Sequence, residues 1–258
     1  MSRMPVLFVG HGSPMNALEE NPCSLAWIDL GKHLQRPNAI LCVSAHWFTR
    51  GTLINDTIAP RQVYDMYGFP ETLYRVKYPA AGAPEYAHRV SELLGDAVKI
   101  DNSWGLDHGA WSVLRRIFPA ADVPAFQLSV DALAPLESHF SIGKALSPLR
   151  DEGVLILGSG NIVHNLALVD WENEGGFRWA QDFDLYIKNA VLNRRYGDTF
   201  HLSEAGESAR LAVPAPDHFA PILYTLGASG ESDYISVFNE ACVLGSLSMT
   251  GYLFSDNT

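Results

Sequence analysis

The sequence predicts an α/β fold, with a single domain over residues 1–258 built around a covered, mostly parallel sheet. Three observations lead to this prediction. Short apolar runs without polar alternation are typical of strands that are buried on both faces. Segments with a helical spacing of apolar residues separate these runs, as in βαβ units. The chain has 258 residues, 47% of them hydrophobic, and no long linker, so one large core is expected.

The first strand is expected at residues 5–10, where an apolar run ends in the sequence Gly10-His11-Gly12. The run is too short for a typical helix, and the two glycines let the chain turn and leave space beside the ring of His11. Two interpretations of this residue stay open. His11 is either a metal ligand presented at the end of a strand or a histidine that simply packs there.

The second strand repeats this pattern. A helix is expected at residues 24–34, before Pro37, and an apolar run at 39–44 then leads into His46. Strand, helix and strand form a βαβ unit, whose right-handed crossover brings both carboxyl ends to the same edge of a parallel sheet. His11 and His46 are therefore expected to share one metal ion.

Residues 49–82 are predicted to form a long aromatic segment over the edge of the sheet. The segment lacks helical spacing and contains Tyr64, Tyr67, Phe69, Tyr74 and Tyr78. Long ordered loops of compact domains are usually functional, and an aromatic wall suits a planar ring. Ordinary loop packing explains the same residues equally well.

A third histidine follows a helix expected at residues 84–94. His108 lies in a glycine-bracketed loop before a helix expected at 112–118, which Asp107 is predicted to cap. The positive end of a helix disfavours an imidazolium, so His108 suits a neutral base or a hydrogen-bonding group. An ordinary loop histidine is the alternative.

A further strand also leads to a histidine. Strands are expected at 123–130 and 153–158, with a helix at 135–149 between them, and Gly158-Ser159-Gly160 then precedes His164. The glycines could cradle a phosphate, but the sequence lacks both the full G-x-G-x-x-G spacing and the lysine of a P-loop.

The rest of the chain is expected to complete the domain. Two prolines before His218 fix the approach to a last helix, which runs toward Leu226 and which Asp217 is predicted to cap. The other elements expected here are helices at 177–196 and 202–211 and closing strands at 235–238 and 244–254.

Composition limits the partners of the protein. A formal net charge of −11 and a pI near 5.2 argue against a nucleic-acid surface, which needs clustered Lys and Arg. The odd number of cysteines, at unrelated spacings, fits reduced thiols. Residues 1–9 hold too short an apolar run for a signal peptide, and no stretch is long enough to cross a bilayer. We expect a cytoplasmic protein that binds neither nucleic acid nor membranes, and its oligomeric state is left open.

Five of the nine histidines lie at strand ends or beside Gly and Pro, namely His11, His46, His108, His164 and His218. Several neutral imidazoles at one sheet edge suit Zn(II), Fe(II), Cu or Ni, and suit the oxygen-preferring Mg(II) and Ca(II) poorly. We therefore expect one divalent metal ion.

In chain order, the histidine motifs resemble those of the class III extradiol ring-cleaving dioxygenases, and more narrowly the DOPA 4,5-dioxygenase type. The motifs are Gly10-His11-Gly12-Ser13-Pro14-Met15, Ser44-Ala45-His46-Trp47, Asp107-His108-Gly109, Ser159-Gly160-Asn161-Ile162-Val163-His164-Asn165 and Pro216-Asp217-His218. The resemblance covers nearly the whole chain, up to Gly245-Ser246-Leu247-Ser248-Met249. It implies helices on both faces of the sheet, a metal site at the carboxyl ends of the strands, and cleavage of a small aromatic diol, a DOPA-like catechol, with both atoms of O2.

The resemblance also implies a role for each histidine. His11 and His46 match two metal ligands, and His218 falls where better-known class III enzymes have glutamate. A zinc ion is implied for a four-histidine set of His11, His46, His164 and His218. Fe(II) is expected for ring cleavage, because zinc cannot cycle electrons. His108 and His164 are then the catalytic acid/base residues, and His164 leaves the metal to act.

Two other functions stay open. One is a zinc-dependent hydrolase, in which metal-bound water attacks a carbonyl. The other is a non-catalytic metal-binding relative of the same fold. A catechol that carries a carboxylate, such as DOPA, would suit a basic residue, for which Arg61, Arg75 and Lys77 are the candidates.

Overall fold

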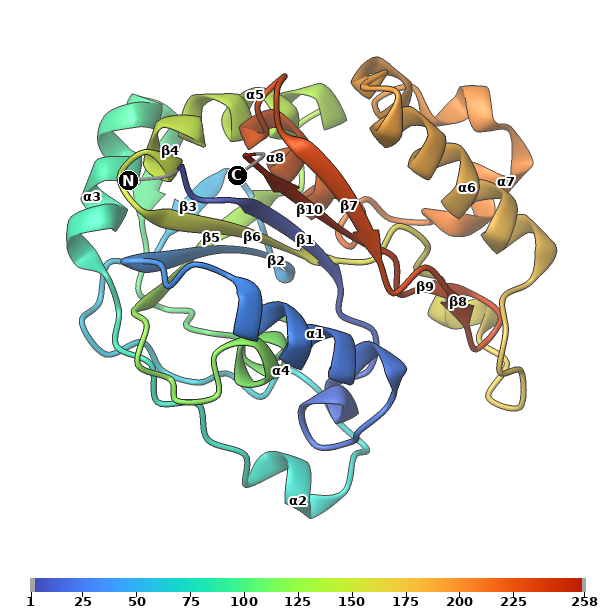
Figure 1. Cartoon of the computed structure of the whole chain (residues 1–258), viewed down its shortest axis with the longest axis horizontal. Helices are drawn as coiled ribbons and strands as arrows, with labels where there is room; N and C mark the ends of the chain where they lie inside the picture. The colour runs from blue at the N-terminus through green and yellow to red at the C-terminus, as the bar shows by residue number, and fades with distance from the viewer. Residues whose placement is uncertain (1–2, 257–258) are drawn as a thin grey trace.

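A computed structural model describes residues 3–256, so residues 1, 2, 257 and 258 of the predicted domain lie outside the described chain. Helices and strands alternate over most of its length (Figure 1). In chain order, the strands and α-helices are β1 (Val6–Gly10), α1 (Pro22–His33), β2 (Ala39–Thr49), β3 (Thr52–Ile54), α2 (Glu71–Tyr74), α3 (Pro84–Leu94), β4 (Val98–Ile100), α4 (His108–Ile117), β5 (Ala125–Asp131), α5 (Leu136–Leu146), β6 (Val154–Gly160), α6 (Arg178–Leu192), α7 (Glu207–Ala212), α8 (Ala220–Ala228), β7 (Tyr234–Phe238), β8 (Cys242–Val243), β9 (Leu247–Ser248) and β10 (Gly251–Ser255).

The main sheet has eight strands in the order β4-β3-β5-β2-β6-β1-β10-β7. Its central neighbours β5, β2, β6 and β1 run parallel. Strand β3 is antiparallel to β5. At the other side of the sheet, β10 is antiparallel to β1, and β7 is antiparallel to β10. The prediction of one α/β domain with a mostly parallel sheet is therefore confirmed.

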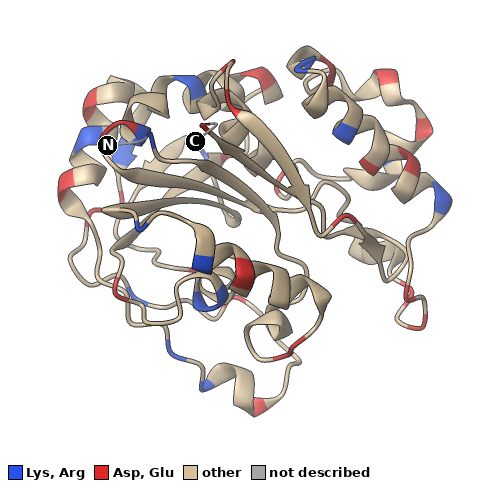
Figure 2. Cartoon of the chain, viewed as in Figure 1, with Lys and Arg blue, Asp and Glu red and all other residues tan. Residues whose placement is uncertain are grey.

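Helices cover both faces of the sheet, as the family resemblance implied (Figure 1). In β1, Val6 and Phe8 pack into the core cluster beneath α3, α5, α6 and α8. The intervening Leu7 and Val9 pack into a second cluster with α1 and α4. Since alternate side chains of a strand point to opposite faces, a run that is apolar throughout needs cover on both sides. Charged residues lie mainly on the helices and loops around these strands (Figure 2).

The parallel register lines up the ends of three strands at one edge of the sheet. Gly10 of β1 pairs with Gly160 of β6, and Ser44 of β2 pairs with Ser159. The residues that follow these positions therefore share the carboxyl edge, where ligands of open α/β sheets bind.

Several boundaries differ from the sequence prediction. Strands β3 and β4 were not predicted, because each has only three residues. The expected loop at 49–82 thus contains β3 as well as the short helix α2. Strand β2 continues past its expected end through His46, with an irregular register between Val43 and Phe48. A strand this long brings His46 to the edge as part of the sheet.

The C-terminal third also departs from the prediction in places. The helix expected at 202–211 is a 3-10 turn followed by α7, because Gly206 has a φ of +68° and interrupts it. The strand expected at 244–254 is divided into β9 and β10. Among the described residues, no helix is both long and apolar enough to cross a bilayer.

A buried ion pair lies near the amino ends of β1 and β6, where α8 ends. Arg150 and Asp233 are 0% and 1% exposed, and their side chains form a two-pronged contact at 2.8 and 3.1 Å. Arg150 also donates to the carbonyls of Met4, before β1, and Ala228, at the end of α8. Both charges are therefore satisfied by several partners, which is the condition under which a buried pair is tolerated.

We expect Asp233→Ala to lower the free energy of unfolding by about 3–5 kcal/mol, because it leaves the Arg150 charge buried without its partner. Asp122→Ala is the control, since it removes an exposed pair with Arg36 and should cost about 0–1 kcal/mol. Urea unfolding followed by circular dichroism measures both. Equal losses in the two variants would contradict this role of the buried pair.

Candidate metal centre

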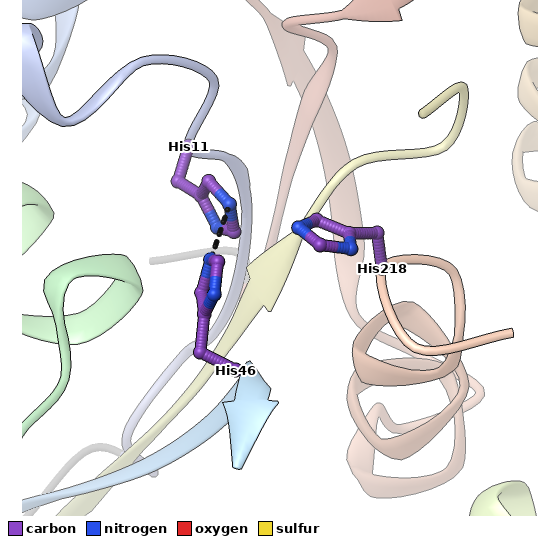
Figure 3. A group of neighbouring side chains, drawn as sticks. All are labelled: His11, His46 and His218. Atoms are coloured by element: carbon purple, nitrogen blue, oxygen red, sulfur yellow. Dashed lines mark hydrogen bonds between the residues drawn. The ribbon is translucent and has the colours of Figure 1, made fainter. Parts of the chain in front are cut away.

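Three of the predicted histidines converge at the carboxyl edge of the sheet. His11 follows β1, His46 lies in β2, and His218 precedes α8. One ring nitrogen from each lies within 4.8 Å of the other two. Figure 3 shows the three rings pointing into the same space from three separate segments. His11 and His218 are buried and His46 is partly buried, so this space is shielded from most of the solvent.

Hydrogen bonding determines which nitrogen of His11 is available. The Ser159 hydroxyl donates its only proton to the carbonyl of Gly109, at 2.6 Å. Toward Nδ1 of His11, at 3.0 Å, the same oxygen can therefore act only as an acceptor. Nδ1 carries the proton, and Nε2 presents a lone pair to the cluster.

Carboxylates face the outer nitrogens of the other two rings. Nδ1 of His46 lies 3.2 Å from Asp65 Oδ2, and Nδ1 of His218 lies 3.1 Å from Asp217 Oδ2. The His218 contact lacks the alignment of a hydrogen bond. Because a carboxylate is negative and offers only lone pairs, its closeness still favours the tautomer with the proton on Nδ1 in both rings. Nε2 is then the free nitrogen in both rings, as in the carboxylate–histidine–metal arrangement of metalloproteins.

The burial of the rings keeps them neutral. Desolvation lowers the pKa values of His11 and His218 well below 6.5, and the neighbouring imidazoles lower them further. Desolvation and His108 also lower the pKa of His46. Nε2 of His11 and Nε2 of His46 are only 3.2 Å apart, close enough for a hydrogen bond if one of them carried a proton (Figure 3). With both protons on Nδ1, two lone pairs face each other instead and repel. A cation between them would remove this repulsion, so the donor set fits a divalent metal ion that binds imidazole.

The structure places the other two predicted histidines beside this set. The ring of His164 stacks on His218, with centroids 3.4 Å apart and planes 5° apart. His108 lies against His46, with ring centroids 3.9 Å apart. His164 is not one of the three residues whose nitrogens approach one another, so its role as a fourth ligand stays a prediction.

Local sequence explains why these segments can approach so closely. A Cβ at Gly160 would lie 2.2 Å from the carbonyl oxygen of His218, and a Cβ at Gly109 would lie 2.8 Å from the ring of His46. Asp107 caps α4, as predicted, by accepting from the N–H of Ala110. The helix therefore begins at His108 itself, four residues before the expected start.

The predicted cap at Asp217 is wrong. Helix α8 begins only at Ala220, and the Asp217 carboxylate instead accepts from the backbone N–H of His218 at 2.8 Å. The carboxylate therefore fixes the histidine rather than the end of the helix.

The sequence prediction missed two residues of the site, Ser159 and Asp65. Ser159 lies in the Gly-Ser-Gly sequence that was considered only for phosphate. Asp65 lies in the aromatic segment. The sequence marked this segment as a functional loop but did not single out Asp65 within it. Its carboxylate contacts both His46 and His108, and these two rings form a second group with it within 4.8 Å.

The basic residues proposed for a substrate carboxylate have partners elsewhere. Arg61 donates to the carbonyl of Ser103, and Arg75 lies 3.4 Å from Glu71. Lys77 donates to the hydroxyl of Tyr64, the residue next to Asp65, at 3.1 Å. Of the three candidates, Lys77 is therefore the one that contacts a neighbour of Asp65 in the sequence.

A covered parallel sheet with imidazoles gathered at its carboxyl edge defines an α/β protein with a candidate metal centre. Residues 8–254 match the family model described as the catalytic LigB subunit of aromatic ring-opening dioxygenase. The chain therefore belongs to this family of aromatic ring-opening dioxygenases.

Individual relatives agree with this assignment. The chain is 44% identical over 253 residues to a 4,5-DOPA dioxygenase extradiol of Escherichia coli K12, covering 96% of this chain and 93% of the relative. It is 36% identical over 255 residues to the protein of that name from Beta vulgaris, covering 96% and 95%. A crystal structure of an uncharacterized protein from Escherichia coli K12 superposes with a TM-score of 0.85 at 40% identity, covering 97% of this chain and 99% of the other. The predicted resemblance to extradiol dioxygenases of the DOPA 4,5 type is confirmed, and the chain is an extradiol dioxygenase.

We expect Ser159→Ala to weaken metal binding about 10–100-fold, because it removes the acceptor that holds the Nδ1 proton of His11. Competition with a chromophoric zinc chelator measures the affinity. Ser141→Ala is the control, since its hydroxyl donates to a carbonyl on the exposed side of α5. Wild-type affinity in a folded Ser159→Ala protein would show that His11 needs no such support.

Proposed function

We propose that the chain opens the ring of a catechol with O2, at a single divalent metal ion held by His11, His46 and His218. The observation that supports this most is the convergence of three neutral imidazoles at the carboxyl edge of the sheet, in a chain that belongs to the ring-opening dioxygenase family. We propose DOPA as the first substrate to test, because the relatives of highest identity given above are named for it.

We infer Fe(II) as the ion of the active enzyme and Zn(II) as an ion that the same site holds. Bound Fe(II) would supply open positions for a catechol and dioxygen, and a redox-active centre through which electrons of the catechol reach the dioxygen. Zn(II) has no redox chemistry and is satisfied by four ligands, of which His164 would be the fourth. Within the cluster, His164 is stacked on His218 and so needs only a local movement to exchange between the two roles.

His164 and His108 are the candidates for moving protons. Burial lowers the pKa of His164 to about 4, so the ring is neutral at pH 7 and can take a proton from a catechol hydroxyl. His108 packs against His46, with Nδ1 3.0 Å from Asp65. Two imidazoles, one packed on His218 and the other on His46, suit a substrate with two neighbouring hydroxyl groups.

The cysteines bear on the cell compartment. The cysteines Cys23, Cys42 and Cys242 are free in the described chain. We infer a cytoplasmic enzyme from these thiols, which persist in reducing compartments.

Anaerobic loading with Fe(II), followed by DOPA and air, tests the proposed reaction. We expect oxygen uptake and a yellow semialdehyde, with little of either after loading with Zn(II). A zinc hydrolase would act with zinc and without oxygen. A non-catalytic relative would bind iron and oxidise no member of a panel of catechols, and either result would overturn the proposal.

We expect His108→Ala and His164→Ala each to lower turnover of the iron-loaded enzyme by about 10²–10⁴-fold, because each removes a general acid/base. His164→Ala should also weaken zinc binding if it supplies the fourth ligand. His88→Ala is the control, because this exposed histidine pairs with Asp56 away from the cluster. Turnover close to wild type in both site variants would contradict the assigned roles.

A further inference from the structure

Within residues 3–256, Asp65 is the one carboxylate that forms close contacts with two of the site histidines. It lies in the segment between β3 and α3, and its side chain is only 13% exposed. Oδ2 lies 3.2 Å from Nδ1 of His46. Oδ1 lies 3.0 Å from Nδ1 of His108 and accepts from the backbone N–H of the same residue at 2.9 Å. Both oxygens are therefore engaged, one with each histidine.

The backbone around Asp65 is held independently of its carboxylate. The N–H of Val63 donates to Leu106 at 2.8 Å, and the indole of Trp111 donates to the carbonyl of Val63 at 2.9 Å. The hydroxyl of Tyr64 donates to the carbonyl of Val76 at 2.6 Å. Because these contacts remain when the carboxylate is changed, a substitution at Asp65 should leave the segment in place.

The geometry distinguishes a positioning role from direct metal binding. His46 faces His11 with Nε2 and faces Asp65 with Nδ1, so one ion cannot reach both sides of the ring. A carboxylate on Nδ1 fixes the tautomer and the orientation of a ligand that binds metal through Nε2. The second oxygen of Asp65 already holds the start of α4, where His108 lies.

We propose that Asp65 is a positioning residue that holds His46 as an Nε2 ligand and keeps His108 beside it, so that one carboxylate sets both the metal site and the acid/base group. The part that concerns His46 depends only on metal binding. The part that concerns His108 rests on the proposed ring-opening function.

Zinc affinity of the full chain tests the first part. We expect Asp65→Asn to bind one Zn²⁺ per chain about 10–100-fold more weakly than wild type in competition with a chromophoric chelator. Asp56→Asn is the matched control, because Asp56 contacts a histidine from the same segment, His88, outside the cluster. Its zinc affinity should equal that of wild type.

Two outcomes would overturn the positioning role. One is a folded Asp65→Asn protein with wild-type zinc affinity. The other is a wild-type stoichiometry of two Zn²⁺ per chain that falls to one in Asp65→Asn, which would make Asp65 a ligand of a second ion. Should Asp65→Asn fail to fold, Asp65→Ser replaces it. We expect the same weakening of zinc binding, and the same two outcomes would overturn the role.

A double-mutant cycle on DOPA turnover of the iron-saturated enzyme tests the second part. We expect the loss in Asp65→Asn/His108→Ala to be clearly smaller than the product of the two single losses, because part of the effect of the carboxylate passes through His108. Losses that multiply would contradict the coupling. If wild type opens no catechol ring, the proposed function fails, and the zinc measurement alone decides the role of Asp65 at His46.

Discussion

The site depends on one constraint, which is that several neutral imidazoles must present lone pairs to the same small space. In His11, His46 and His218, an acceptor faces Nδ1 and leaves Nε2 toward the centre. The acceptors differ, since one is a hydroxyl and two are carboxylates. Burial disfavours the charged form of each ring, so the cluster favours a metal ion over protons.

The topology of the sheet provides this arrangement. Parallel strands β1, β2 and β6 end at one edge, and the chain returns there before α8 to add His218. The N–H of Asn161, directly after β6, donates to the carbonyl of His218 at 2.8 Å. The approach of these segments needs the bare backbone of Gly160. The sheet topology, this hydrogen bond and the glycine thus together place His218 beside the end of β6.

Much of the site could be predicted from sequence, because strand ends followed by small residues and histidine recur in the chain. His11 and His46 follow from the βαβ rule, and His108, His164 and His218 from their contexts and their order. Asp65 could not be predicted in the same way. No strand or helix marks its position, and only the folded chain brings it 3.0 Å from His108. Strands β3 and β4 were not predicted for a related reason, since three residues give no recognisable periodicity.

The central claim is that one ion binds through Nε2 of His11, His46 and His218. The most direct measurement is a crystal structure of the zinc-loaded protein with anomalous data at the zinc edge. We predict a single anomalous peak about 2.0–2.1 Å from those three nitrogens. A peak bound instead to Asp65, His108 and Nδ1 of His46 would contradict it.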